Sequence, residues 1–152
     1  MGVDISSSTI GYSICESGNL TLQGHYKPLK AKSKGKENSL AERLSKTYKD
    51  MKKIFKDNNP DVVVIEDYAK RFSTGRSSAR TIIVLSCFNE VVAMSCLDSI
   101  KKMPIRYTVS SIRKTLGIKG KTEKEDILEK VLIKYPDFKV SLNRNFLQAY
   151  FY

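Results

Sequence analysis

Cysteine is scarce in this chain, and its placement excludes two common uses of the residue. The three cysteines, Cys15, Cys87 and Cys96, are odd in number and lack the close pairs of metal-binding motifs. They therefore predict buried thiols in a reducing cytosol rather than a disulfide framework. Histidine is scarcer still, because His25 is the only one, and we assign it no role.

Other signals are missing as well. The N-terminus has no basic segment ahead of an apolar stretch, so it does not read as a secretory signal; it opens directly with a strand pattern. Internal repeats and domain linkers are absent from the sequence. A chain of 152 residues is long enough to bury a real core, and one domain spanning residues 1–152 is the simplest account.

Acidic residues are few relative to basic ones. The chain has 27 Lys and Arg residues against 16 Asp and Glu residues, which gives a formal charge of +11. A surface with this excess is typical of proteins that bind nucleic acid or anionic membranes. Nucleic acid is favoured and a membrane is not, because no basic amphipathic helix with a bulky apolar face stands out.

Alternating strand and helix patterns follow one another along the chain. The first half predicts strands at 2–5, 9–15 and 20–26, a mobile basic loop at 28–38, and a helix that Ser39 caps and that ends at 58–60. The second half predicts a central strand at 62–65, a helix at 77–99, a strand at 103–109, a basic connector at 111–121, and a helix opened by a capping box of Thr122 and Glu125.

The predicted helix at 77–99 is apolar on almost every side, which indicates burial on almost every side. Two interpretations stay open: a central core helix, or a helix shared between the core and a partner in a homodimer. A transmembrane span is not favoured, because Asn89 and Glu90 interrupt a stretch that is already short for crossing a bilayer.

Two strands carry an acid where the apolar run ends. Asp4 follows Gly2-Val3, and Glu66 follows the run from Val62 to Ile65. Burying an unpaired charge costs several kcal/mol, and pairing or metal coordination is the usual way to avoid this cost. The two acids therefore suggest a divalent cation held between two strands.

The order of elements and these acids resemble the ribonuclease H-like nucleases, and within them the RuvC-type Holliday junction resolvases. The motifs that carry the resemblance are Gly2-Val3-Asp4 with Ser6 and Gly11-Tyr12, the strand from Val62 to Glu66, and Arg113-Lys114-Thr115 followed by Gly120-Lys121-Thr122-Glu123-Lys124. Together they extend from Gly2 to about Leu132.

The resemblance implies an α/β, ribonuclease H-like fold with a central mixed five-stranded sheet, three antiparallel strands followed by parallel strands, flanked by helices. It also implies an Mg²⁺-dependent crossover junction endodeoxyribonuclease, in which Mn²⁺ can replace Mg²⁺. Asp4 and Glu66 would be catalytic metal ligands, and Lys124 would be a catalytic residue that stabilises phosphate charge. A homodimer formed through the helix at 77–99 would nick opposed strands of a four-way DNA junction, in the cytoplasm of a bacterial, phage or viral system.

Further residues are candidates for contact with DNA. Phe72 lies in a polar stretch, where an exposed aromatic ring can stack on an unpaired base. The basic candidates are Arg71, Arg76, Arg80, Arg113, Lys114, Lys119 and Lys121.

The chain departs from the family pattern near its end. Resembling enzymes take two more metal ligands from the start of a final helix, but this sequence has no acid after Asp137. We therefore expect that the final helix is lacking, and two alternatives stay open. One is a catalytically silent ribonuclease H-like domain that binds branched DNA or structured nucleic acid, and the other is a nuclease for a different substrate, such as structured RNA.

Overall fold

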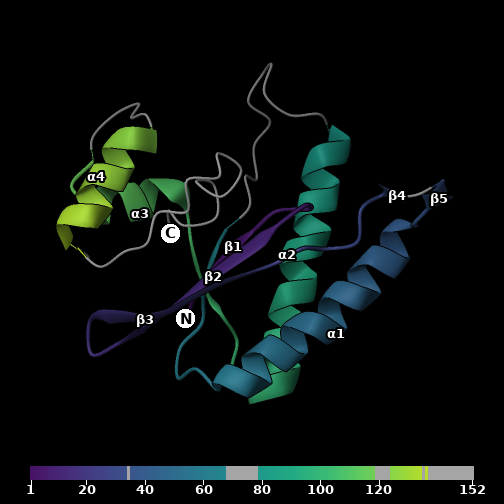
Figure 1. Ribbon diagram of the computed structural model, residues 1–152, viewed down its shortest axis with the longest axis horizontal. Coiled ribbons are helices and arrows are strands. Elements are labelled where there is room, and N and C mark those ends of the chain that lie inside the picture. Colours follow the sequence, from purple (N-terminus) through teal and green to yellow (C-terminus); the bar gives the residue numbers. More distant parts are fainter. Residues whose placement is uncertain (34, 68–78, 119–123, 135, 137–152) are drawn as a thin grey trace.

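A five-stranded sheet forms the centre of the fold (Figure 1). The computed structural model describes residues 1–33, 35–67, 79–118, 124–134 and 136. The strands are β1 (Gly2–Ile5), β2 (Ile10–Glu16), β3 (Asn19–Tyr26), β6 (Val64–Glu66) and β7 (Ile105–Tyr107), in the order β3-β2-β1-β6-β7. The first three form an antiparallel meander, whereas β6 pairs in parallel with both β1 and β7. The predicted mixed sheet is confirmed.

Two long helices, α1 (Leu40–Asn58) and α2 (Ala79–Ile100), pack against each other and against one face of this sheet (Figure 1). The core between them consists of alternate strand residues and of one side of each helix. Its fully buried members include Val3, Ile10, Ile65, Met51, Phe55, Phe88 and Val92. Because side chains alternate along a strand, the residues next to these strand positions point to the opposite face of the sheet.

Helix α1 begins and ends as its sequence predicts. The Ser39 hydroxyl accepts the Glu42 N–H at 3.2 Å, and the Glu42 carboxylate accepts the Ser39 N–H at 2.7 Å, which is a capping box. The last helical residue is Asn58. The next residue, Asn59, caps the helix with a left-handed φ of 38°, and Pro60 follows it.

A polar cluster joins α1 to the C-terminal end of α2. The Tyr48 hydroxyl lies 2.7 Å from the Asp98 carboxylate, which also forms an ion pair with Lys52. Lys101 approaches the second Asp98 oxygen at 3.7 Å. Hydrogen bonds from Lys52 and Tyr48 lower the pKa of Asp98 to about 2. The carboxylate therefore stays charged well into the acidic range and holds the two helices in register.

Two predicted loops contain secondary structure. The segment expected to be a mobile loop forms a small hairpin of β4 (Lys32–Ser33) and β5 (Lys36–Glu37), with Gly35 in the turn at φ +77°. The expected connector at 111–121 instead contains the short helix α3 (Val109–Thr115), whose cap Thr108 accepts the Ser111 N–H at 3.2 Å. Helix α4 (Lys124–Lys134) follows, and the predicted capping box at Thr122 lies outside the described residues.

The surface of α2 corrects the expectation that this helix is buried on nearly every side. Ile83 and Met94 are each 59% exposed, and Leu97 is 44% exposed, whereas Phe88 and Val92 on the other side lie in the core. Helix α2 is also long and apolar enough to span a membrane by length and composition alone, a test that core helices of soluble proteins pass as well. One stripe of α2 thus faces outward in a single chain.

Candidate metal centre

Asp4 and Glu66 lie side by side at the carboxyl ends of two adjacent parallel strands. The strand register pairs Gly2 with Val64 and Val3 with Ile65, so the next residues along β1 and β6 are the two acids. Paired strands lie about 4.8 Å apart. Both acids are half-buried, and they point away from the helices because Val3 and Ile65 point toward them. The structure therefore brings the two predicted metal ligands together.

Two further side chains share this row of the sheet. Gly11 pairs with both Asp4 and His25, and Tyr107 pairs with Glu66, which gives the row His25, Gly11, Asp4, Glu66 and Tyr107. Gly11 contributes no side chain between the imidazole and the first carboxylate. Sequence reasoning did not connect His25 with the acids, because only the strand register shows that they share a face.

The turn after Asp4 is fixed by its own hydroxyl groups. The Ser6 hydroxyl donates to the Thr9 carbonyl oxygen at 2.8 Å and accepts the Thr9 N–H at 3.0 Å. The Ser6 N–H also donates to the Thr9 carbonyl oxygen at 3.1 Å. These bonds hold the connection between β1 and β2 in one shape and so define where β1 ends.

A buried arginine that sequence reasoning missed holds the same turn from outside. The Arg43 side chain, on α1, donates from Nη2 to the Ser7 carbonyl oxygen and from Nε to the Leu29 carbonyl oxygen, both at 2.8 Å. Its guanidinium carbon lies 5.1 Å from the centre of the Phe88 ring on α2. Only 9% of Arg43 is exposed. The residue thus holds the turn that follows Asp4.

The carboxylates of Asp4 and Glu66 provide some, but not all, of the oxygen ligands that a divalent cation such as Mg²⁺ takes. Mg²⁺ prefers oxygen ligands and usually keeps several waters, so one or two protein carboxylates can hold it. Among the described residues, no group of three or more His, Cys, Asp or Glu side chains could bind a metal. Asp4 and Glu66 can therefore supply two oxygen ligands, and Asp67 follows directly after the end of β6.

The predicted DNA-contact residues divide into two groups. Arg71, Phe72, Arg76, Lys119 and Lys121 lie outside the described residues, as does the side chain of Lys124 at the start of α4. The others lie in α2 and α3. Arg80 is exposed in the first turn of α2, whereas Lys114 is exposed and Arg113 half-buried in α3. Helix α3 begins just after Tyr107, which pairs with Glu66. The helix therefore starts near the carboxyl ends of the parallel strands β6 and β7.

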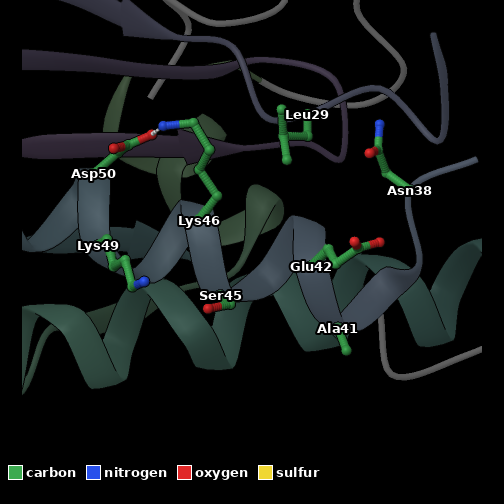
Figure 2. Close-up of a pocket in the computed structure, with 8 residues that line it drawn as sticks. All are labelled: Leu29, Asn38, Ala41, Glu42, Ser45, Lys46, Lys49 and Asp50. Atoms are coloured by element: carbon green, nitrogen blue, oxygen red, sulfur yellow. Dashed lines mark hydrogen bonds and ion pairs between the residues drawn. The ribbon is translucent and has the colours of Figure 1, made fainter. Parts of the chain in front are cut away.

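A groove of about 680 Å³ lies elsewhere, between the segment after β3 and the outer side of α1 (Figure 2). Its lining residues are Leu29, Asn38, Ala41, Glu42, Ser45, Lys46, Lys49 and Asp50. Lys46 points to Asp50, and their charged atoms lie 2.8 Å apart. Neither candidate metal ligand lines this groove, so it is a surface separate from the metal centre.

Comparisons with known proteins agree with this geometry. A family model described as crossover junction endodeoxyribonuclease RuvC matches residues 1–136. The structure of Thermus thermophilus RuvC in complex with a Holliday junction substrate is 12% identical, with a TM-score of 0.69 over 97% of this chain and 85% of that one. Another Thermus thermophilus RuvC structure is 14% identical, with a TM-score of 0.66 over 97% of this chain and 86% of that one. No curated protein sequence matches significantly. The expected ribonuclease H-like fold is confirmed.

Proposed function

Because this chain belongs to the RuvC family of crossover junction endodeoxyribonucleases, we propose that it acts as one nuclease domain that resolves four-way DNA junctions by Mg²⁺-dependent phosphodiester hydrolysis. The observation that carries the proposal is the placement of Asp4 and Glu66 at the same level of adjacent parallel strands, on the face away from α1 and α2. That placement joins two acids that are far apart in the sequence into one anionic site.

The roles of the residues follow from charge. Asp4 and Glu66 would hold Mg²⁺, or Mn²⁺ in its place, and the bound cation would supply an activated water and neutralise charge on the phosphate. The turn bonds of Ser6 and the two hydrogen bonds of Arg43 keep the end of β1 fixed, so Asp4 needs little reorganisation when DNA arrives. Lys124 would stabilise the charge that develops on the scissile phosphate.

The basic residues near the strand ends would position the DNA backbone. Arg113 and Lys114 lie in α3, which begins just after β7, and Arg80 lies in the first turn of α2. Arg71, Arg76, Lys119 and Lys121 fall in the adjoining stretches of sequence. Phosphate contacts of this kind fix orientation without reading sequence. Phe72 would stack on an unpaired base at the junction centre.

We further propose a homodimer through α2. Its outward stripe runs from Ile83 through Cys87 and Glu90 to Met94 and Leu97, at alternating spacings of four and three residues. This is the spacing of a seam between two helices, and a twofold interface needs such a self-complementary patch. Two subunits would then present two metal centres to opposed strands of one junction.

The dimer is tested by replacing exposed residues of the stripe. Met94→Glu should give a folded monomer in size-exclusion chromatography with light scattering, because it replaces an exposed apolar side chain of the stripe with a charge. Lys53→Glu, on the exposed side of α1, is the matched control and should leave the dimer intact. A Met94→Glu protein that is folded and still dimeric would remove α2 from the interface.

The activity is tested with a labelled synthetic four-way junction and Mg²⁺, beside Asp4→Asn and Glu66→Gln. Paired symmetric nicks that both substitutions abolish would establish the proposed reaction. Tight binding of the junction without cutting would instead favour the alternative, a catalytically silent domain that binds branched DNA.

A DNA substrate and three free cysteines lead us to place the protein in the cytoplasm.

A further inference from the structure

The hairpin of β4 and β5 belongs to a segment with a strong positive charge. Residues 27–38 contain Lys27, Lys30, Lys32, Lys34 and Lys36 against a single acid, Glu37. The exposed side chains of Lys30 and Lys32 form no ion pair among the described residues, although Lys32 lies opposite Glu37 in the hairpin register. Neighbouring like charges repel each other, so these lysines do not serve the stability of the fold.

Hydrogen bonds fasten the base of this hairpin. The Asn38 side-chain amide donates to the Lys30 carbonyl oxygen, and the Asn38 backbone N–H donates to the Ala31 carbonyl oxygen, both at 2.8 Å. Pro28 just before the segment is buried. The lysines therefore stand on a backbone that is held in place, which is the arrangement that lowers the entropy cost of binding.

Arg43 sets the position of the hairpin relative to the metal centre. One guanidinium binds both Leu29, at the base of the hairpin, and Ser7, in the turn that follows Asp4. The hairpin also adjoins the N-terminal end of α1 (Figure 1). The base of the hairpin therefore lies near the turn that follows Asp4.

We propose that Lys30 and Lys32 bind the phosphate backbone of one junction arm, next to the phosphate that lies at Asp4 and Glu66. This inference rests on the proposed function and adds to it a binding element outside the metal centre. Phosphate contacts contribute affinity and orientation, not sequence preference. The hairpin accordingly strengthens junction binding on any sequence and leaves the cleavage rate at saturating DNA unchanged.

The test compares two double variants that lose the same charge. Lys30→Ala with Lys32→Ala removes the hairpin charges, whereas Lys53→Ala with Lys56→Ala removes two exposed lysines about 15–20 Å further along α1 than Arg43. The affinity for a labelled four-way junction is measured by fluorescence anisotropy in EDTA over a series of salt concentrations. Each phosphate contact contributes about 0.9 to the slope of log affinity against log salt.

We expect the hairpin variant to lose about two units of this slope and to cut at the wild-type rate when DNA is saturating. The α1 variant should keep its slope. An unchanged slope in the hairpin variant, or an equal loss in both variants, would overturn the assignment while leaving the nuclease function intact. If the wild-type protein neither bound nor cut the junction, the proposed function itself would fail, and this inference with it.

Discussion

Replacing Arg43 by Met should destabilise the protein and disorder the turn beside Asp4. Met keeps most of the length and the apolar stem of the side chain but cannot donate a hydrogen bond. The change removes the two 2.8 Å bonds to Ser7 and Leu29 and the contact with the Phe88 ring. It tests whether this one residue joins α1, α2, the turn and the hairpin.

The magnitude follows from four contributions. Each of the two hydrogen bonds comes from a charged donor and is worth about 1.5–3 kcal/mol, and the desolvated cation–π contact adds about 2 kcal/mol. Against this, Met avoids the cost of burying a cation, which is several kcal/mol. The two backbone carbonyls that lose their donor cost about 1–3 kcal/mol each unless water reaches them. The expected net loss in the free energy of unfolding is about 3 kcal/mol.

Urea denaturation followed by circular dichroism measures this loss. A change of about 3 kcal/mol should also lower Tm by roughly 6–12 °C in a chain of this size. Arg43→Lys should fall between Met and the wild type, because an ammonium group keeps the charge but cannot match the planar fork that reaches both carbonyls. Lys46→Ala breaks only the exposed pair with Asp50 and should cost about 0.3–0.5 kcal/mol.

A loss below about 1 kcal/mol for Arg43→Met, similar to a surface substitution, would refute this account of the residue. The role of Arg43 in positioning Asp4 is tested by a separate measurement. At a temperature where Arg43→Lys is fully folded, it should bind the junction but cut it more slowly than the wild type, since the end of β1 is less firmly held. Full cleavage activity in that variant would show that Arg43 stabilises the fold without positioning Asp4.

Three further substitutions test other parts of the structure. Gly24→Ala places a methyl group 2.3 Å from the Tyr12 ring, so the ring must shift, and the substitution should cost about 1–3 kcal/mol in the same urea assay. The hydrogen bond with Lys52 lowers the pKa of Asp98 to about 2, so the contribution of Asp98 to stability is present above pH 4 and is lost as pH falls toward 2. Asp98→Asn should therefore flatten the decline in unfolding free energy across that range. Burial raises the pKa of Tyr26 to about 12, so its contribution is lost as pH rises from 10 to 12, and Tyr26→Phe should remove that alkaline decline.

The sequence predicts those parts of the fold that depend on neighbours along the chain. Ser39 and Glu42 define the start of α1 because both partners of the capping box lie within one turn. The meander of β1, β2 and β3 was also predictable, since short turns join its strands. The hairpin after β3 was missed because a run of lysines hides the Gly35 turn and the bonds that Asn38 makes to its base.

Features that depend on distant parts of the chain were harder to predict. An acid at the end of each apolar strand suggested a cation between Asp4 and Glu66, but only the parallel pairing of β1 with β6 makes them neighbours. His25 reached the same row through register alone. Arg43 gave no signal, because an arginine on an amphipathic helix is normally exposed. The outward stripe of α2 was likewise invisible in a helix that is apolar all round.

The parallel pairing of β1 with β6 has a consequence for folding kinetics. Gly2 meets Val64 across more than sixty positions of the chain, and closing so long a loop costs entropy before any contact repays it. The meander can form locally and early, and it then carries Asp4 without Glu66. The two candidate metal ligands therefore come together only when β6 docks, and a partly folded chain with the meander alone presents Asp4 without its proposed partner.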